Sequence, residues 1–490
     1  MKKLINSYKN WNPSKLATIL FLMMPFIVFV FIDFKLDNDF WFLVNTGKTI
    51  IKEGFITIEP FTIHSDLVFI PQQWLTDVIF NCIYSNFNIY GMYIFVLLCN
   101  SLVIFIFYKT AYLMCNNRKK AILITVLVDI ILLSTRLLTT RPQIFDIIIF
   151  SLELLLLELY IKKNKKIYLL FMPLLSLFMI NAHASTWAML FVLMIPYYVE
   201  YFIFKIRKKE VYKIWPIFIM TITSILVSFI NPYGIDAIKY LFNSYGISKI
   251  NMAVYEMRSI TITSFAGKII YLIMLFCLYS FYHNKDHNKL RYFFLFVGIS
   301  YITLNHYKSL AYLAMIIPLI LGYNFYSKKT FKEKKNSMLE KIVYAIIMVF
   351  ILFMTLFRVT LSDAVDIKEF ADYLDDNASF DIKLFTSYNN GGYMEYRGYK
   401  CYIDPRAEVF LKANNKKEDI FDEYYDLINY DIDIKVFLDK YNFDYLLVNS
   451  RLKYLLKELQ ENTNYEKVLS KITDDEEKIT TYLFKRVSNS

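Results

Sequence analysis

Two carboxylates, one residue apart, follow the first apolar stretch of the chain. Asp37 and Asp39 lie in "KLDNDFWFLVNTG" (35–47), directly after apolar residues 16–32. A carboxylate in this position can remove a proton from an acceptor hydroxyl, and a pair can bind a divalent cation such as Mg²⁺ or Mn²⁺. The structural alternative is that they end one helix and cap the next, since Asp is a favourable N-cap residue. Two carboxylates exceed what one cap needs, which favours chemistry.

Further acids, bases and cations lie in loops that the topology below places on the same side of the membrane. The full set is Asp37, Asp39, His64, Arg141, His183, Glu256, Arg258, His306 and Lys308. Such a set suits group transfer from a lipid phosphate, because Arg and Lys bind the phosphate while an acid or His moves the proton. The structural alternatives are an arginine that contacts headgroups, interfacial histidines, a Glu–Arg pair in one loop and a snorkelling lysine.

Metal and disulfide signals elsewhere in the chain are weak. His283 and His287 have the i, i+4 spacing of helical metal ligands, with Asp286 between them, but their loop is short, hydrophilic and expected in the cytoplasm. The five cysteines form no CxxC pair and no cluster with His. The sequence therefore predicts neither a disulfide nor a structural zinc site.

The composition is that of a polytopic α-helical membrane protein. Of the 490 residues, 56% are hydrophobic, and Tyr (40) and Phe (44) are abundant. The net charge of +11 would suit nucleic acid, but Lys and Arg cluster in short loops between apolar runs, so no nucleic-acid partner is expected. The basic N-terminus precedes an apolar run that no A-x-A-like site follows, which predicts an uncleaved first transmembrane helix.

Apolar runs predict about eleven transmembrane helices, given the roughly 20 residues that a helix needs to cross a bilayer. They cover 16–34, 88–114, 121–138, 143–161, 167–181, 185–204, 214–231, 267–283, 290–305, 309–326 and 338–358. Every second loop is basic, which is typical of cytoplasmic loops. We therefore expect a multi-pass protein of the plasma (cell) membrane with a cytoplasmic N-terminus and an extracytoplasmic C-terminal region.

Two domains are expected, a transmembrane domain at 1–360 with its first outer loop at 35–87, and a small extracytoplasmic α/β domain at 361–490. The first outer loop shows helical spacing after Phe40 and again at 71–87. Residues 363–490 carry 26 Asp and Glu against 18 Lys and Arg. Their pattern alternates between helices and strands. The helices are expected at 367–377 and 433–442, and the strands at 382–387, 400–406, 443–449 and 478–486. Gly391 and Gly392 predict a tight turn.

An ordered set of motifs resembles bacterial multi-spanning proteins related to the GT-C glycosyltransferases. The first is "LDNDFWFLVNTGKTIIKEGFITIEPFT" (36–62), in which an acidic pair precedes a Trp-containing helix and a turn. The others follow in order as "QQWLTDVIF" (72–80), "TRPQIFDIIIFSL" (140–152), "NAHASTWAMLF" (181–191), "NPYGIDAIKYL" (231–241), "GGYMEYRGYKCYIDPRAEVF" (391–410) and "YNFDYLLVN" (441–449). The resemblance covers nearly the whole chain.

The resemblance implies a GT-C-like membrane core and transfer of a sugar from a polyprenyl-phosphate donor on the outer face. In such enzymes an Asp of the first loop serves as base or metal ligand, which here corresponds to Asp37 or Asp39. The resemblance also matches Arg141, His183 and Glu256 to positions in the family's ordered motifs, without assigning them roles. The chain departs from the family at Gln72 and Gln73, where His-Glu is more typical before "WL", so one acid and one base are missing.

The leading hypothesis is an inverting, lipid-phosphate-sugar-dependent glycosyltransferase acting on an envelope glycan, lipid or protein. Its catalytic candidates are Asp37, Asp39, His183 and Glu256. Its substrate-binding candidates are Arg141, Arg258, His306 and Lys308. A divalent cation, if used, would be held by Asp37 and Asp39. Other partners would be membrane lipids and envelope-assembly proteins.

Two other functions are compatible with the sequence. A transporter or flippase for a lipid-linked glycan needs ionisable groups in the middle of the membrane. The main charged residues within the spans are Asp129, Asp146, Glu153 and Glu158, of which Asp129 is expected nearest the middle. A non-catalytic envelope-assembly protein would use residues 361–490 to bind a partner, but an anchor needs only one span.

Overall fold

A computed structural model describes residues 13–31, 33–244, 258–284, 289–327, 336–363, 365–474 and 478–487. Contacts divide the chain into two units. The helical unit comprises Met1–Phe34, Tyr93–Ile230 and Val254–Ser362, and the mixed unit comprises Lys35–Met92, Asn231–Ala253 and Asp363–Ser490. The predicted first outer loop (35–87) thus belongs to the same unit as residues 363–490. The division into domains at 1–360 and 361–490 stays a prediction.

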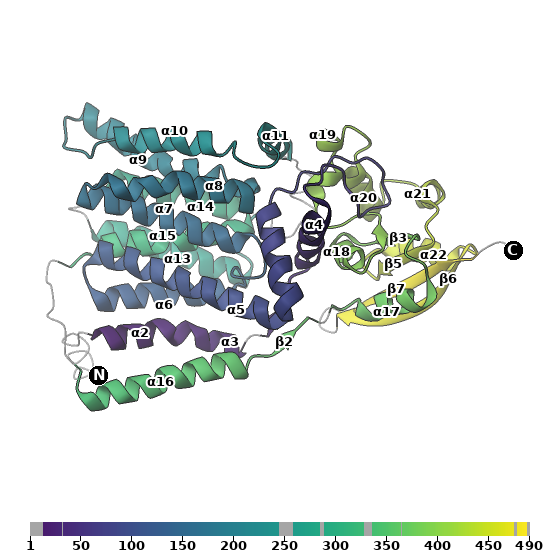
Figure 1. Cartoon of the computed structure of the whole chain (residues 1–490), viewed down its shortest axis with the longest axis horizontal. Helices are drawn as coiled ribbons and strands as arrows, with labels where there is room; N and C mark the ends of the chain where they lie inside the picture. The colour runs from purple at the N-terminus through teal and green to yellow at the C-terminus, as the bar shows by residue number, and fades with distance from the viewer. Residues whose placement is uncertain are drawn as a thin grey trace. The chain divides into compact units, whose positions relative to one another are not determined.

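The helical unit is a bundle whose helices run side by side (Figure 1). Its elements are α2 (Lys15–Met23), η1 (Met24–Ile27), α3 (Val28–Phe31), the second part of α5 (Trp74–Cys115), α6 (Arg118–Ser134), α7 (Gln143–Lys163), η2 (Lys166–Phe171), α8 (Met172–Ala182), η3 (Ala184–Thr186), α9 (Met189–Ile206), α10 (Trp215–Val227), α13 (Phe265–His283), α14 (Leu290–Asn305), η5 (Tyr307–Ser309), α15 (Leu310–Asn324) and α16 (Met338–Phe357). Each predicted apolar run coincides with one of these helical segments.

Four helical segments of the described residues are long and apolar enough to cross a membrane. They are Trp74–Cys115, Ala184–Ile206, Ala266–His283 and Met338–Phe357. The shorter apolar helices are also compatible with a membrane bundle, but the count of eleven spans stays a prediction. The last span illustrates how the sequence sets a helix start: Ser337 and Glu340 form a capping box at the beginning of α16.

A kink separates the two parts of α5. Asn88 has φ 50° and ψ −151°, which is outside the helical region, so α5 is two helices joined at this residue. The kink lies between the predicted helix at 71–87 and the predicted span at 88–114. The boundary between the units falls just after the kink, so the mixed unit contains α5 up to Met92 and the helical unit contains it from Tyr93.

The mixed unit combines short helices with a five-stranded sheet. Its elements are α4 (Phe40–Glu53), the first part of α5, α11 (Ile235–Ser244), α17 (Lys368–Asn377), β3 (Lys383–Thr386), α18 (Tyr388–Tyr396), β4 (Lys400–Cys401), η6 (Ala407–Phe410), α19 (Lys412–Asn415), α20 (Ile420–Asn429), α21 (Ile434–Tyr441), β5 (Tyr445–Asn449), α22 (Lys453–Glu461), β6 (Tyr465–Asp474) and β7 (Ile479–Arg486). Two short strands at the ends of segments of the helical unit, β1 (Phe34–Lys35) and β2 (Leu361–Ser362), form a separate sheet.

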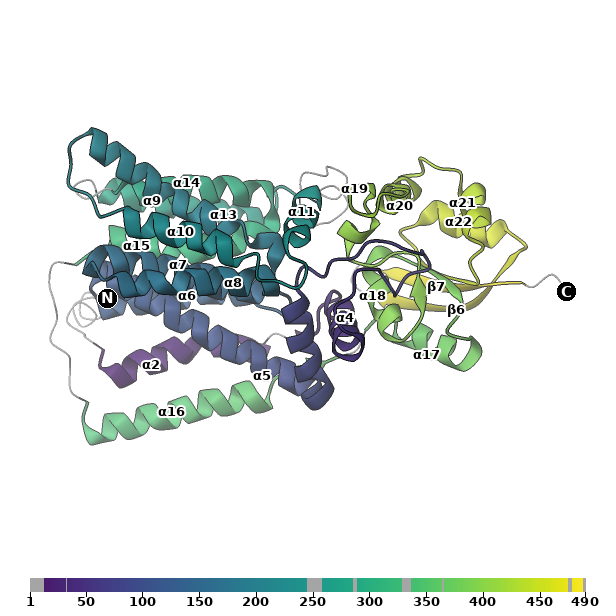
Figure 2. The same ribbon diagram turned by 45° about the horizontal axis from the view of Figure 1, so that its top comes forward.

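The larger sheet has the strand order β4-β3-β5-β7-β6. Strand β3 pairs in parallel with β4 and β5, whereas β5, β7 and β6 pair antiparallel. In Figure 2, α17 lies on one side of this sheet, and α21 and α22 lie on the other. The outer edge of β4 is covered by the first loop, because Thr62 forms a parallel bridge with Cys401. The sequence predicted this α/β organisation, although it missed α18, α20, α22 and β6.

One sequence prediction is wrong. Gly391 and Gly392 do not form a tight turn but lie inside α18. Packing explains why glycine stands there: a Cβ on Gly391 would lie 2.0 Å from the carbonyl oxygen of Ile403, and one on Gly392 would lie 3.4 Å from Phe42. The glycines therefore allow α18 to approach both α4 and the loop that follows β4.

Candidate functional site

The acidic pair lies at the start of α4 in the mixed unit. The Asp37 Oδ1 accepts a hydrogen bond of 3.0 Å from the backbone N–H of Asp39, which forms a local turn. Asp39 occupies the N-cap position, but its side chain makes no capping hydrogen bond. The capping alternative therefore explains Asp37 in part and does not explain the carboxylate of Asp39.

Close backbone packing holds the helix that follows this pair. A Cβ on Gly47 would lie 2.1 Å from the carbonyl oxygen of Asp77 at the start of α5. Trp41, near the start of α4, packs edge-on against Tyr84 and Tyr393, with ring centroids 5.7 and 5.1 Å apart. Both contacts are inside the mixed unit, so α4 is fixed by residues from α5 and α18.

Asp39 acts electrostatically on a partly buried phenol of the same unit. The pKa of Tyr388 is raised well above its usual value, chiefly by burial and then by the negative charges of Asp39 and Glu408. The Tyr388 hydroxyl donates to the carbonyl oxygen of Pro405 at 2.6 Å. Because its pKa is raised, Tyr388 stays protonated and serves as a fixed hydrogen-bond donor near the acidic pair.

The mixed unit also contains a buried ion cluster. Arg406 is 1% exposed and interacts with Glu59 at 2.8 Å, with Glu395 at 3.4 Å and with Asp404. Glu59 also accepts from the backbone N–H groups of Phe61 (2.9 Å) and Thr62 (2.8 Å). The cluster therefore joins the first loop to the loop that follows β4.

Three carboxyl groups surround one guanidinium in this cluster, so the charges do not balance. The pKa of Glu395 is raised well above its usual value, first by burial and then by the neighbouring Asp404. Glu395 therefore keeps its proton to higher pH than an ordinary glutamic acid, and the acid proton can be donated to Asp404. The pKa of Arg406 is raised as well, because Asp404 and Glu59 outweigh its desolvation. The cluster holds the first loop and the loop after β4 together, and the sequence analysis did not identify it.

His64 also connects the first loop to the residues after β4. Its Nε2 lies 2.8 Å from the carbonyl oxygen of Tyr402, which can only accept, so Nε2 carries a proton. Its ring packs against Tyr402, Phe410 and Tyr441. Burial lowers the pKa of His64, so the ring is neutral and holds the first loop against the C-terminal residues.

In the helical unit, His183 forms a pair with a carboxylate. Its Nδ1 lies 2.8 Å from Oδ1 of Asp146, and the Thr186 hydroxyl donates to the same oxygen at 2.8 Å (both pair members are buried). Asp146 lies in the first turn of α7, and His183 ends α8. A carboxylate that binds Nδ1 orients the imidazole and leaves Nε2 to exchange a proton. His183 was a predicted candidate, whereas Asp146 was noted only as a charge within a span.

The cationic candidates Arg258 and Lys308 lie on neighbouring segments of the helical unit. The carbonyl oxygen of Arg258 accepts from the N–H of Tyr307 at 3.1 Å, which places it beside the residue between His306 and Lys308. A second backbone bond, Ile260 N–H to the Leu304 oxygen at 2.9 Å, continues this pairing. The structure therefore brings together three of the four predicted substrate-binding residues.

Two predicted candidates remain, Arg141 and Glu256. Arg141 lies just before α7, where its carbonyl oxygen accepts from the N–H of Ile144 at 3.1 Å. Glu256 lies outside the described residues, as does His287 of the weak histidine pair. Within the described ranges, no group of three or more His, Cys, Asp or Glu residues could hold a metal. Asp37 and Asp39 would suit Mg²⁺ only together with water and substrate oxygens.

A second buried arginine links three helices of the bundle. Arg291 of α14 binds both oxygens of Glu158, at 3.0 and 3.1 Å, and its guanidinium also contacts Glu200 of α9. Glu158 lies near the end of α7 and also accepts from the hydroxyls of Tyr197 (3.0 Å) and Tyr292 (2.7 Å). This network accounts for one of the charged residues that the sequence places within the spans.

Comparisons with known proteins support the fold. No family model and no curated protein matches the sequence. The structure is similar to the crystal structure of the oligosaccharyltransferase from Archaeoglobus fulgidus in the apo form, with a TM-score of 0.50 and 9% sequence identity. The similarity covers 89% of this chain and 70% of the archaeal chain. At this identity the similarity shows the fold alone: the chain has a fold like that of the archaeal protein, and the number of membrane spans stays a prediction.

Proposed function

We propose that this protein is an integral membrane glycosyltransferase that moves a sugar from a polyprenyl-phosphate-linked donor to an envelope glycan, lipid or protein. The observation that carries the proposal is the acidic pair at the start of α4, in a chain with an oligosaccharyltransferase-like fold. Asp39 is the first candidate for the base, because it lies at the N-cap position of α4 and its charge acts on Tyr388, whereas the Asp37 carboxylate closes a local turn.

In the proposed reaction, Asp39 accepts the proton of an acceptor hydroxyl as its oxygen attacks the anomeric carbon. The bond from that carbon to the phosphate oxygen breaks, and the lipid phosphate leaves with the bonding electrons. The attack occurs on the side opposite the phosphate, so the configuration inverts. A divalent cation, if the enzyme uses one, would be held by Asp37 and Asp39 and would neutralise charge on the phosphate.

Roles in the helical unit form a separate part of the proposal. Arg258, Lys308 and His306 would bind the donor phosphate, since backbone pairing brings their segments together. Arg141 would contribute a further cation. The His183–Asp146 pair would transfer a proton to or from a substrate, with Asp146 holding the imidazole in orientation. Glu256 keeps its sequence-based role as an additional acid.

The decisive experiment compares envelope glycans and lipid-linked sugars in cells carrying native protein, no protein or Asp39→Asn. We expect Asp39→Asn to lose the same glycan as the deletion and to accumulate the same donor, with at least a ~100-fold loss of transfer, since a general base contributes about 10²–10⁴-fold. Asp66→Asn is the matched control, because Asp66 lies in the same loop, is exposed and has a φ of 58° that Asn tolerates. A glycan pattern unchanged by Asp37→Asn and Asp39→Asn together would contradict the proposal.

A transporter for a lipid-linked glycan is a second candidate, and one observation favours it. Glu153 is buried and lies ten residues from either end of α7, so an ionisable group lies in the middle of this helix. The sequence analysis had expected Asp129 to be the charged residue nearest the middle of a span. Purified protein that moves labelled lipid-linked glycan across liposomes without consuming donor would favour this function over sugar transfer.

A further inference from the structure

Among the described residues, Glu153 differs from Asp129 and Glu158 in that its carboxyl group has no hydrogen-bond partner. It is 1% exposed, and its Oε2 has no hydrogen-bond partner among the described residues. By contrast, Asp129 accepts from the Asn100 amide at 3.2 Å, and Glu158 is held by Arg291. Glu153 is therefore the buried acid of α7 whose chemistry the proposed function leaves unexplained.

The position of Glu153 on α7 explains its isolation. Glu158 is five residues away and points to a different side of the helix, since each residue turns it by about 100°. Asp146 is seven residues before Glu153, two turns away on the same side, or roughly 10 Å along the axis at 1.5 Å per residue. Glu153 thus lies between the two paired acids of its helix and reaches neither Arg291 nor His183.

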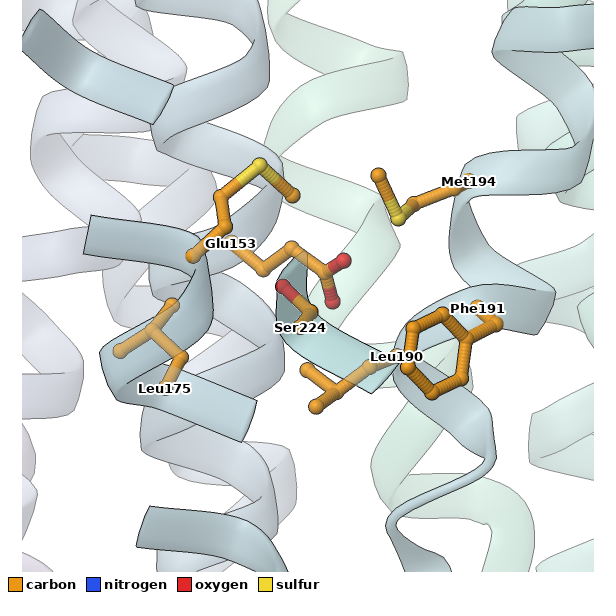
Figure 3. A pocket seen from close by; sticks show the side chains of 7 residues that line it. Glu153, Leu175, Leu190, Phe191, Met194 and Ser224 are labelled. Atoms are coloured by element: carbon orange, nitrogen blue, oxygen red, sulfur yellow. The ribbon is translucent and has the colours of Figure 1, made fainter. Parts of the chain in front are cut away.

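The Glu153 carboxyl points into a small pocket (Figure 3). The pocket leaves about 10 Å³ for the centre of a water molecule, which is about the room that one water needs. Its lining is apolar apart from Glu153 and Ser224, and it includes the thioethers of Met172 and Met194. In Figure 3 the carboxyl lies between Ser224 on one side and Met194 and Phe191 on the other.

We propose that Glu153 is a neutral carboxylic acid that binds, together with the Ser224 hydroxyl, one water molecule inside the bundle. A lone ionised carboxylate in such surroundings would cost far more free energy than it costs to keep its proton. The acid O–H donates to the water, and the Ser224 oxygen accepts from it. A metal cation is disfavoured, because it needs several oxygen ligands and the pocket offers two polar side chains.

The Ser224 side of the pocket is fixed by a chain of hydrogen bonds. The indole N–H of Trp187 donates to the Ser176 hydroxyl at 2.8 Å, and that hydroxyl donates to the Ser224 carbonyl oxygen at 2.7 Å. Trp187 follows directly after Thr186, which contacts the His183–Asp146 pair. The water site is therefore anchored to the same segment that carries the pair, and it does not depend on the sugar-transfer proposal.

Infrared difference spectroscopy of the full chain in nanodiscs tests the proposal. When the spectrum of the Glu153→Gln variant is subtracted from that of the native protein, the difference should show the carbonyl stretch of a protonated acid. This band should have the same position in mildly acidic and mildly alkaline buffer. It should also show a water O–H stretch that shifts in ¹⁸O-enriched water. Asp129→Asn is the matched control, because it removes another buried carboxyl of the bundle and should leave both Glu153 bands in place.

Ser224→Val keeps the Glu153 carboxyl and tests the water alone. It should remove the water band and shift the acid band, and it can be measured even if Glu153→Gln does not fold. Loss of ionised-carboxylate bands in Glu153→Gln would overturn the proposal, since Glu153 would then be charged. An acid band without any water band, or a water band unaffected by Ser224→Val, would overturn the water site.

Discussion

Among the described residues, each unit of the molecule contains one buried arginine, and the two are satisfied in different ways. Arg291 in the helical unit faces two glutamates, and tyrosine hydroxyls complete the coordination of Glu158. Arg406 in the mixed unit faces Glu59, Glu395 and Asp404, and its guanidinium carbon lies 5.1 and 4.7 Å from the ring centroids of Phe61 and Phe69.

The difference lies in how excess negative charge is handled. In the helical unit, neutral hydroxyl donors stabilise Glu158 beside one guanidinium. In the mixed unit, a proton on Glu395 removes one charge, and backbone N–H groups of a turn stabilise Glu59. Buried ion clusters lose much solvation, so removing one partner costs far more free energy than the intact cluster adds in net stability. The first joins three helices, and the second joins two distant parts of the chain.

Removal of Arg406 should have the largest effect. Arg406→Ala leaves three buried carboxyl groups without a cation, and breaking a buried pair costs about 3–5 kcal/mol. We expect a lower thermal midpoint in detergent and rapid proteolysis within 35–92 and 363–490. Arg397→Ala is the control, because Arg397 also binds two acids, Asp372 and Asp375, but these are 49% and 34% exposed. An equal effect of the two variants would contradict the importance of burial.

Removal of Arg291 should have a smaller effect, of about 3 kcal/mol, because Tyr197 and Tyr292 still donate to Glu158. Thermal unfolding of the purified protein measures it. Replacing the charged members together, as Arg291→Met with Glu158→Leu and Glu200→Leu, should recover most of the loss, since apolar side chains of similar volume often substitute for buried pairs. If the triple variant is as unstable as Arg291→Ala, then the charged cluster adds net stability and its members do more than neutralise one another.

Removing one hydroxyl should have an intermediate effect. Tyr292→Phe deletes the 2.7 Å hydrogen bond to Glu158, and a bond to a charged group contributes about 1.5–3 kcal/mol. Tyr198→Phe is the control, because its hydroxyl pairs with the neutral Thr221 at 2.6 Å and should contribute about 1 kcal/mol. The two thermal midpoints would then differ in that order, and the reverse order would count against charge-assisted bonding at Glu158.

The smallest change should be a shift in pH dependence. The folded state keeps a proton on Glu395 that the unfolded state releases above its ordinary pKa of about 4.3. Native stability should therefore fall as pH rises above about 5, and this fall should be weaker in Glu395→Gln, which cannot ionise. Thermal midpoints across a pH series test this, and parallel curves would contradict a protonated Glu395.

Periodicity and loop charge predicted most of the architecture. The apolar runs coincide with helices, and β3, β5, β7, α17 and α21 lie where alternation and helical spacing placed them. Helix α18 was missed because its glycines normally mark turns, whereas here Gly391 lies against Ile403 and Gly392 lies against Phe42. Strand β6 was missed because its burial follows no simple alternation, and two register irregularities interrupt its pairing with β7.

The candidate site was predictable residue by residue but not pair by pair. His183 and the cations near His306 could be named because ionisable residues next to apolar runs are conspicuous. The Asp146 partner could not, since 37 residues separate it from His183 and no local pattern joins them. Arg406 stands in "IDPRAEVF", where alternating acids around a lone arginine were the available signal, but Glu59 lies 347 residues earlier.

That separation has a consequence for biosynthesis. The first loop is made early, yet Arg406 follows Glu59 by 347 residues, which at about 5–20 residues per second means a delay of roughly 20–70 s. During this time Leu67 and Phe69, which are 1–2% exposed in the finished protein, have no C-terminal core to enter. The newly made loop must therefore be shielded until the end of the chain arrives, so the mixed unit completes its folding only after translation has nearly ended.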